Sequence, residues 1–160
     1  GLTTTQIAAM TTGQVAALGT GQIAGLTSTQ LGALNSSQVG VLSAGQLSAI
    51  STGIASLSTS GVTGLTSTQI SGFGTDQADA LTSAQVAALR STQIAAFSTQ
   101  NLGKFTPTEI GSINTTAVAG LSTTDIAALS STQLQGIKTT QLQAMNTSQV
   151  SAFVLAYQAI

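Results

Sequence analysis

A large apolar residue recurs every eight positions along almost the whole sequence, and this spacing restricts the fold more than any other feature. The series runs from Leu2 to Phe153 and contains one step of seven, between Ile50 and Leu57. A second apolar row follows five positions after the first, and Ala78 is its one weak member. Because a short fixed period is typical of stacked repeats, we predict about 19 repeats across residues 1–153, one of them shortened near residues 51–56.

The consensus repeat, Leu-Thr-Ser-Thr-Gln-Ile-Ala-Ala, resembles the start of a short helix. Position two is mostly Thr, Ser or Asn, which are preferred N-cap residues, and a Gln at position five completes a capping box. The one proline of the chain fits this pattern, because Thr106, Pro107 and Glu109 occupy the N-cap, N1 and N3 positions. Glu109 and Asp125 replace Gln at position five, where a carboxylate suits the helix dipole. Positions three to eight are therefore predicted to be helical.

One continuous helix is excluded, because eight residues at about 100° each shift the apolar rows by about 80° per repeat. Broken helices avoid this drift, since position six and the following position one are three residues apart and share a helix face. Helices this short need neighbours to be stable. The sequence therefore predicts an all-α, elongated solenoid (superhelix) of very short capped helices, one per repeat.

A β-solenoid is the alternative fold, because Thr and Ile favour strands. On a strand, however, the two apolar rows would face opposite sides, since they are five and three residues apart. Pro107 would also remove a ladder donor from a strand. These observations favour the helical solenoid.

The two ends of the sequence differ from its middle. After Phe153 the octad is lost, and residues 154–160 are predicted to continue the last helix as a C-terminal cap. We see neither a signal peptide nor an apolar run long enough for a transmembrane helix. The chain begins within the repeat frame, so we expect a segment of a longer repeat array.

The composition excludes several classes of function. Charged residues make up 4% of the chain, against roughly 25% in an ordinary domain. The only cations are Arg90, Lys104 and Lys138, which are too few for a nucleic-acid interface. The absence of His and Cys excludes Ser–His and Cys–His nucleophiles and thiolate or imidazole metal sites. We predict no catalytic, cofactor-binding or metal residues and no enzyme activity.

A few residues allow weaker chemical hypotheses. Lys104 or Lys138 could activate a serine, but a solvated lysine is the simpler interpretation. Asp76 and Asp79 are the one close carboxylate pair, and calcium needs six or more oxygen ligands. Three glycosylation-type sequences and one glycine-rich stretch coincide with ordinary repeat positions: Asn35, Asn114 and Asn146, and Gly19, Gly21 and Gly25.

Serine and threonine could form regular ladders on the solenoid surface. Positions three and four supply such hydroxyls, and Ser28, Ser36, Ser67 and Ser83 are examples at position three. A regular array of this kind would suit binding to ice, glycan or a solid surface, which is the alternative function. The simpler interpretation is that these residues begin helices and keep a charge-poor chain soluble.

The octads Leu26-Thr27-Ser28-Thr29-Gln30-Leu31-Gly32-Ala33 and Leu81-Thr82-Ser83-Ala84-Gln85-Val86-Ala87-Ala88 resemble a known repeat type. They are similar to the Leu-Thr-x-x-Gln-Ile-x-Ala arrays of very large, repetitive bacterial surface or secreted proteins of the adhesin-like kind, over Leu2 to Phe153. The resemblance implies an extracellular or cell-surface stalk, spacer or fibre segment. The expected partners are neighbouring repeats and further copies in a fibre, without membrane insertion. Cap residues are lost at Gly19, Gly74, Arg90 and Lys138, so those repeats should be weaker.

Overall fold

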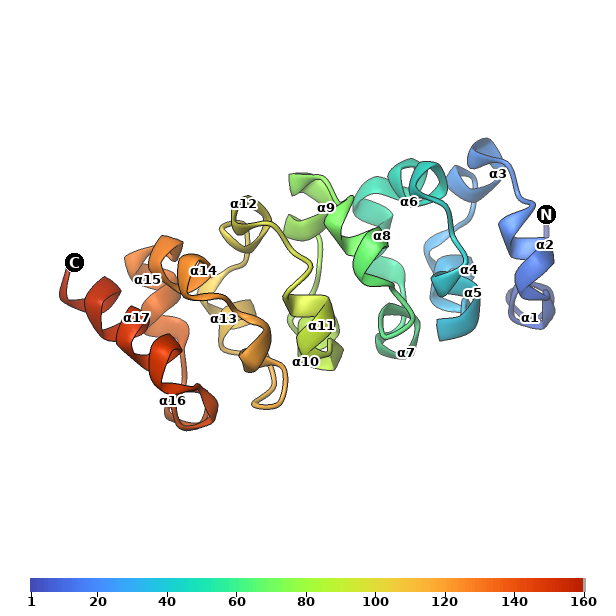
Figure 1. Ribbon diagram of the computed structural model, residues 1–160. Coiled ribbons are helices and arrows are strands. Elements are labelled where there is room, and N and C mark those ends of the chain that lie inside the picture. Colours follow the sequence, from blue (N-terminus) through green and yellow to red (C-terminus); the bar gives the residue numbers. More distant parts are fainter. Residues whose placement is uncertain (160) are drawn as a thin grey trace.

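The protein is a rod of short helices, with the N- and C-termini at opposite ends (Figure 1). This computed structural model describes residues 1–159, and within that range it contains no β-strand. The prediction of an all-α solenoid is confirmed and the β-solenoid alternative is wrong. The α-helices are α1 (Thr4–Ala9), α2 (Thr12–Ala16), α3 (Thr20–Ala24), α4 (Ser28–Gly32), α5 (Ser36–Gly40), α6 (Ala44–Ile50), α7 (Thr59–Val62), α8 (Ser67–Ser71), α9 (Thr75–Asp79), α10 (Ser83–Ala88), α11 (Ser91–Ile94), α12 (Thr99–Leu102), α13 (Pro107–Ile110), α14 (Thr123–Ala128), α15 (Ser131–Gly136), α16 (Thr139–Ala144) and α17 (Thr147–Gln158), with 3₁₀ helices η1 (Ser51–Ser56) and η2 (Val118–Gly120).

Most α-helices begin with the predicted capping box. Thr106 is the N-cap of α13, Pro107 occupies the first helical turn, and the Glu109 carboxylate accepts from the Thr106 amide at 2.7 Å. Where a non-capping residue stands at position two, half of the box remains. Gly19, for example, has no capping side chain, but its amide donates to Gln22 Oε1 at 2.8 Å. The N-cap side chain therefore adds to the stability of a helix start that the residue at position five also stabilises.

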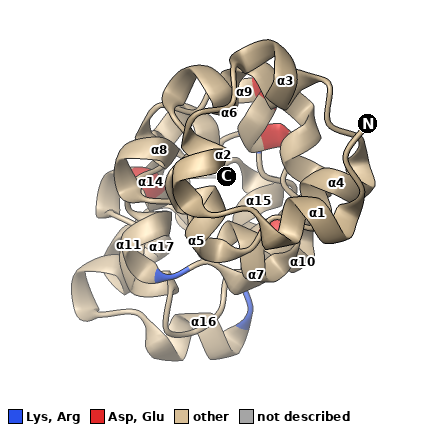
Figure 2. Ribbon diagram, turned by 90° about the vertical axis from the view of Figure 1, so that its right-hand side faces the viewer, with Lys and Arg blue, Asp and Glu red and all other residues tan. Residues whose placement is uncertain are grey.

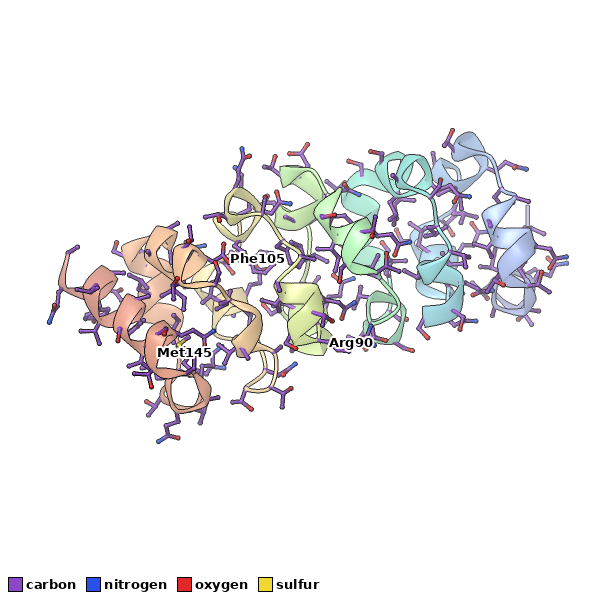
Figure 3. All side chains as sticks on the ribbon, in the orientation of Figure 1. Arg90, Phe105 and Met145 are labelled. Atoms are coloured by element: carbon purple, nitrogen blue, oxygen red, sulfur yellow. The ribbon has the colours of Figure 1, made fainter. Side chains whose placement is uncertain are left out.

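The core is one continuous stripe of the two apolar rows. Position six is buried from Ile7 to Leu134, as at Ile70 and at the weak member Ala78, and only Leu142 and Val150 at the C-terminal end are partly buried. Position one is also buried in the middle of the rod, and it is less covered near the N-terminal end and at Ile137 and Phe153. Three aromatic side chains pack edge to face, because the ring of Phe97 contacts both Phe73 and Phe105. Phe105 lies near the middle of the rod (Figure 3). Each short helix is therefore stabilised mainly by burial against its neighbours.

Helices about three repeats apart stack on one another to form the superhelix. Contacts join α3 to α6, α13 to α15, and α14 to α17. The solenoid consequently has between three and four repeats per turn, a quantity that the repeat spacing alone did not give.

Two repeats depart from one capped helix per octad. In the shortened repeat, α6 continues to Ile50 and the chain passes directly into η1, with Ser51 at φ 43°. The missing residue removes the extended N-cap, so a tight 3₁₀ turn replaces the predicted α-helix. After Asn114, a turn and η2 replace the next helix.

The last helix, α17, continues past the octad to Gln158. The sequence interpretation extended this segment to Ile160, which lies outside the described residues. Across residues 1–159, every helix is too short or too polar to cross a lipid bilayer.

Candidate functional site

The residues considered for chemistry do not form a catalytic group in the described part of the chain. Lys138 lies beside Ser112 in a shallow surface hollow, but Ser112 Oγ donates to the Thr108 carbonyl at 2.7 Å and no hydrogen bond joins it to the lysine. Lys104 is exposed. Asp76 and Asp79 are both exposed on α9, and residues 1–159 contain no group of three or more potential metal ligands among His, Cys, Asp and Glu.

The asparagines of the three glycosylation-type sequences act as caps in the structure. Asn35 and Asn146 each accept a hydrogen bond from the amide at position five of their own helix, Gln38 N at 3.0 Å and Gln149 N at 2.9 Å. Asn114 accepts from Ala117 N at 2.8 Å. The cap interpretation of these residues is therefore confirmed.

The most ordered polar feature of the molecule is the side-chain amide at position five. Its oxygen accepts a hydrogen bond from the N-cap backbone amide of its own repeat, as Gln93 Oε1 does from Arg90 N at 2.9 Å. This bond fixes the amide group and directs Nε2 toward the preceding turn. Gln93 is 1% exposed, so this nitrogen must be satisfied within the protein.

Where an interior repeat has glutamine at position five, its Nε2 donates to backbone carbonyls of the preceding turn. Gln93 Nε2 bonds to Val62 O at 2.9 Å and Leu65 O at 2.8 Å, which are 31 and 28 residues earlier. These are the carbonyls of position six and the next position one. We call this arrangement the amide clamp; it recurs at Gln38, Gln46, Gln69, Gln85, Gln133, Gln141 and Gln149, and with one carbonyl at Gln30 and Gln77.

The amide clamp follows repeat position rather than residue count. Gln69 lies on the other side of the seven-residue step from its acceptors, Val39 and Leu42, and its separations fall to 30 and 27. The acceptors nevertheless keep their positions in the repeat. In the described residues, no buried side-chain nitrogen or oxygen lacks a hydrogen-bond partner. Each buried side-chain polar group of the described residues therefore has a partner, as a buried polar network needs in order to stabilise a fold.

Six repeats have another residue in place of this glutamine: Gly53 and Gly61, which have no side chain to donate, and Asn101, Glu109, Ala117 and Asp125. Asn101 reaches one carbonyl, that of Phe73, at 3.0 Å. Where position five is Ala117, Asn114 at position two donates to Ala87 O and Leu89 O. Asp125 has no donor and instead accepts from Thr99 Oγ1 of the preceding turn at 2.6 Å. Glu109 caps its own helix and makes no bond to the preceding turn in the described structure.

Glycines provide a second kind of contact between turns, by direct packing of backbones. A Cβ atom at Gly64 would overlap the Ser36 carbonyl, and one at Gly40 would lie 3.0 Å from Gly64 O. Similar close approaches occur at Gly120, against Ser91, and at Gly136, against Pro107. None of these glycines has a positive φ. They are therefore required for space rather than for backbone conformation.

The proposed hydroxyl ladders are interrupted. Ser28 and Ser67 are exposed, but Ser36 and Ser83 are half-buried, and Ser67 Oγ donates to Thr92 O at 3.2 Å. Position four is the one repeat position whose residue is exposed in every repeat of the described chain. Its column is broken by residues without a hydroxyl, namely Gly13, Gly21, Gly45, Asp76, Ala84 and Gln100.

Our sequence interpretation missed the second role of position five. A residue that only capped its own helix could be Glu as well as Gln, and Glu would also suit the helix dipole. The sequence places Gln in 13 repeats and a carboxylate only at Glu109 and Asp125. This preference for glutamine over a carboxylate could have indicated the second role, because only the side-chain amide can donate a hydrogen bond to a carbonyl.

One of three comparisons with known proteins confirms that the chain is a repeat protein. A search of curated proteins and a search of solved structures each gave no match. The family model of the ALTTAQ repeat matches residues 1–28, 15–52, 54–91 and 118–154. The unmatched residues 92–117 include Asn101, Glu109 and Ala117, where position five departs from glutamine. Because these matches cover most of the sequence, the chain belongs to the ALTTAQ repeat family.

Proposed function

We propose that the chain is a structural spacer: a stiff repeat segment that separates or presents other modules of a larger extracellular, bacterial surface protein, without catalysis. The observation that supports this role best is the ladder of amide clamps, which links successive turns along most of the rod. A spacer needs length and stiffness, and this ladder supplies both together with the continuous apolar core.

The surface of the rod is consistent with this role. The exposed column at position four varies among Thr, Ser, Gly, Ala, Asp and Gln from repeat to repeat. A face that recognised a regular lattice would need the same side chain at each step. The hydroxyls therefore fit helix capping and solvation better than recognition of ice or a glycan. The extracellular, adhesin-like setting follows from the resemblance of the octads and is part of the proposal.

Two variants, a double substitution on the surface and a single one in the core, test the spacer role in the parent protein. Thr68 is exposed, whereas Ile70 is fully buried two residues later. We expect Thr68→Lys with Thr92→Lys to leave the function of the parent unchanged, and Ile70→Asp to abolish it by breaking two stacked turns. Detection of the segment by antibodies on intact cells tests the surface location.

Small-angle X-ray scattering should show an elongated particle for the wild-type chain and for the double lysine variant. Loss of function in the double lysine variant, with its scattering curve unchanged, would contradict the spacer role and support a binding face. A compact scattering profile for the wild-type chain would contradict the rod itself.

A further inference from the structure

The glutamine of the amide clamp is missing from one complete turn of the rod. Position five is occupied by Asn101, Glu109, Ala117 and Asp125 in four consecutive repeats. Because the solenoid has between three and four repeats per turn, these four repeats cover one whole contact between two turns. We call this contact the central seam. The carbonyl pairs that amide clamps would engage there belong to Ile70 and Phe73, Ala78 and Leu81, Val86 and Leu89, and Ile94 and Phe97.

Two of the four carbonyl pairs at the central seam receive no side-chain hydrogen bond within residues 1–159. They lie opposite Glu109, which caps its own helix, and opposite Asp125, which accepts from Thr99 Oγ1 instead of donating. A third pair is half satisfied, because Asn101 donates to one carbonyl only. The central seam therefore has fewer bonds to carbonyls than the turns clamped by glutamine.

Both charged residues that occupy position five in this chain lie at the central seam. Glu109 and Asp125 are carboxylates, and an ionised carboxylate accepts hydrogen bonds but cannot donate them. Acidic residues also lie on the preceding turn, where α9 carries Asp76 and Asp79, and Figure 2 shows red segments at both α9 and α14. These acidic residues supply acceptors at a contact where other turns have donors.

The apolar core, in contrast, continues through the central seam. Leu102, Ile110 and Val118 at position six are at most 1% exposed. Apolar burial is non-directional, whereas a hydrogen bond restricts both distance and angle. The two turns therefore stay packed together, but a small rotation between them costs less than between clamped turns.

One repeat fastens the central seam at a single place. Asn114 donates to Ala87 O at 3.0 Å and to Leu89 O at 2.9 Å. In the same repeat, a Cβ atom at Gly120 would overlap the Ser91 carbonyl, so the two backbones are in direct contact. The other three repeats of the seam each make at most one side-chain hydrogen bond to the preceding turn in the described structure. A contact that is tight at one repeat and loose at its neighbours has the arrangement of a hinge.

We propose that the central seam is a joint at which the rod bends, with the repeat of Asn114 and Gly120 as the pivot. The clamped turns on either side of the seam move as rigid blocks. The inference rests on the proposed spacer role and deepens it, because a jointed spacer presents the modules that it carries at more than one angle.

Pulsed electron paramagnetic resonance with two spin labels tests the joint, since the sequence contains no cysteine and introduced cysteines are labelled specifically. The joint pair is Thr68→Cys with Thr124→Cys, and the control pair is Ser37→Cys with Thr92→Cys. Both pairs use exposed position-four residues that are seven repeats apart. The first pair spans the central seam, and the second spans turns that amide clamps join.

We expect a broader distribution of label distances for the joint pair than for the control pair. Glu109→Gln supplies the missing donor and should narrow the distribution of the joint pair, and Asn101→Gln added to it should narrow it further. Amide hydrogen exchange in α12 and α13 of this double variant should slow by at least about tenfold, because two or three hydrogen bonds are gained. The distribution of the control pair should not change.

Equal widths for the two pairs in the wild-type background would overturn the inference. A joint pair that keeps its width in both glutamine variants would also overturn it, because the missing clamps would not be the cause of the bending. Either result leaves the elongated scattering profile of the rod as it was, so it is distinguishable from failure of the spacer role.

Discussion

Residues 66–96 and residues 50–64 belong to the same repeat array, yet they hold their preceding turns by different means. In the first region, Gln69 and Gln93 donate side-chain amides to two or more carbonyls of the turn before. In the second region, Gly53 and Gly61 occupy position five and have no side chain to donate. The octad therefore tolerates loss of the amide clamp when the backbones can approach more closely.

The second region replaces the polar bonds with a set of backbone contacts, which we call the glycine contact: Gly32, Gly40, Gly61 and Gly64. Added Cβ atoms at Gly32 and Gly61 would lie 3.1 Å from Ser56 O and Leu34 O. The two regions show that adjacent turns need either a donor for the exposed carbonyls or close packing that excludes water. Four experiments test this difference, in decreasing order of expected effect.

Gly64→Ala should be the most destabilising change. Its Cβ would overlap the Ser36 carbonyl, and backbone cannot move aside as a flexible side chain can. Overpacking of this kind costs about 3 kcal/mol in the free energy of unfolding. Gly21→Ala is the matched control, because nothing lies within 4 Å of its Cβ and its helix position favours alanine by up to about 1 kcal/mol. Urea denaturation measures both; equal stability of the two variants would show that the glycine contact is not tight.

Gln93→Glu should cost about 2–3 kcal/mol at neutral pH, because the buried donor is lost and a carboxylate faces Val62 O and Leu65 O. Gln14→Glu is the same change at an exposed position five and should cost less than about 0.5 kcal/mol. If both variants unfolded at the same urea concentration, the amide clamp would contribute only through its capping bond.

The pH dependence of stability gives a second test of the Gln93→Glu variant. Burial beside carbonyls should raise the pKa of the introduced carboxyl in the folded state above its unfolded value of about 4.3. The destabilisation is then present above the raised pKa and is relieved as pH falls, because a protonated carboxyl can donate again. Relative to the wild-type chain, the Gln93→Glu variant should recover stability in acid, and the Gln14→Glu variant should not.

Much of this architecture follows from local sequence. The capping residues, Pro107 and the two apolar rows predict the helix starts and the buried face, because these depend on neighbours within one octad. The number of repeats per turn depends on how side chains pack between octads, so the period alone did not predict it. The amide clamp also went unrecognised, since its acceptors lie 28 and 31 residues away.

The shortened repeat also shows that contacts between octads cannot be predicted from local sequence. The sequence interpretation placed the lost residue in the polar cap segment before Ile54 and expected a trimmed cap followed by an α-helix, whereas the structure has the 3₁₀ helix η1 there. Ile50 stays in α6 because it is buried there, and Ser51 takes the positive φ that brings Ile54 back to the core. Packing of the apolar row therefore determines the local conformation, although serine, as a non-glycine residue, prefers a negative φ.

Thr66→Ala tests whether the amide clamp survives when the cap is lost. Thr66 Oγ1 accepts from Gln69 N at 3.1 Å, while the Thr66 amide still donates to Gln69 Oε1. We expect a cost of about 1 kcal/mol, the usual value for an N-cap. Thr68→Ala in the same helix is the control, because Thr68 is exposed and its hydroxyl caps nothing. A cost of several kcal/mol for Thr66→Ala would mean that cap and clamp form one cooperative unit.

Ser51→Gly should have the smallest effect, and with the opposite sign. Ser51 is the one non-glycine residue with positive φ among residues 1–159, and it is exposed, so glycine relieves strain without removing a packed side chain. The expected gain is up to about 1 kcal/mol, reduced by the greater backbone entropy that glycine gives the unfolded chain. Ser48→Gly, in the interior of α6, should instead cost about 0.5 kcal/mol, because glycine is a poor helix former there. Opposite shifts of the two melting temperatures would show that the shortened repeat stores strain at Ser51, whereas a loss of stability in both variants would show that the turn into η1 is relaxed.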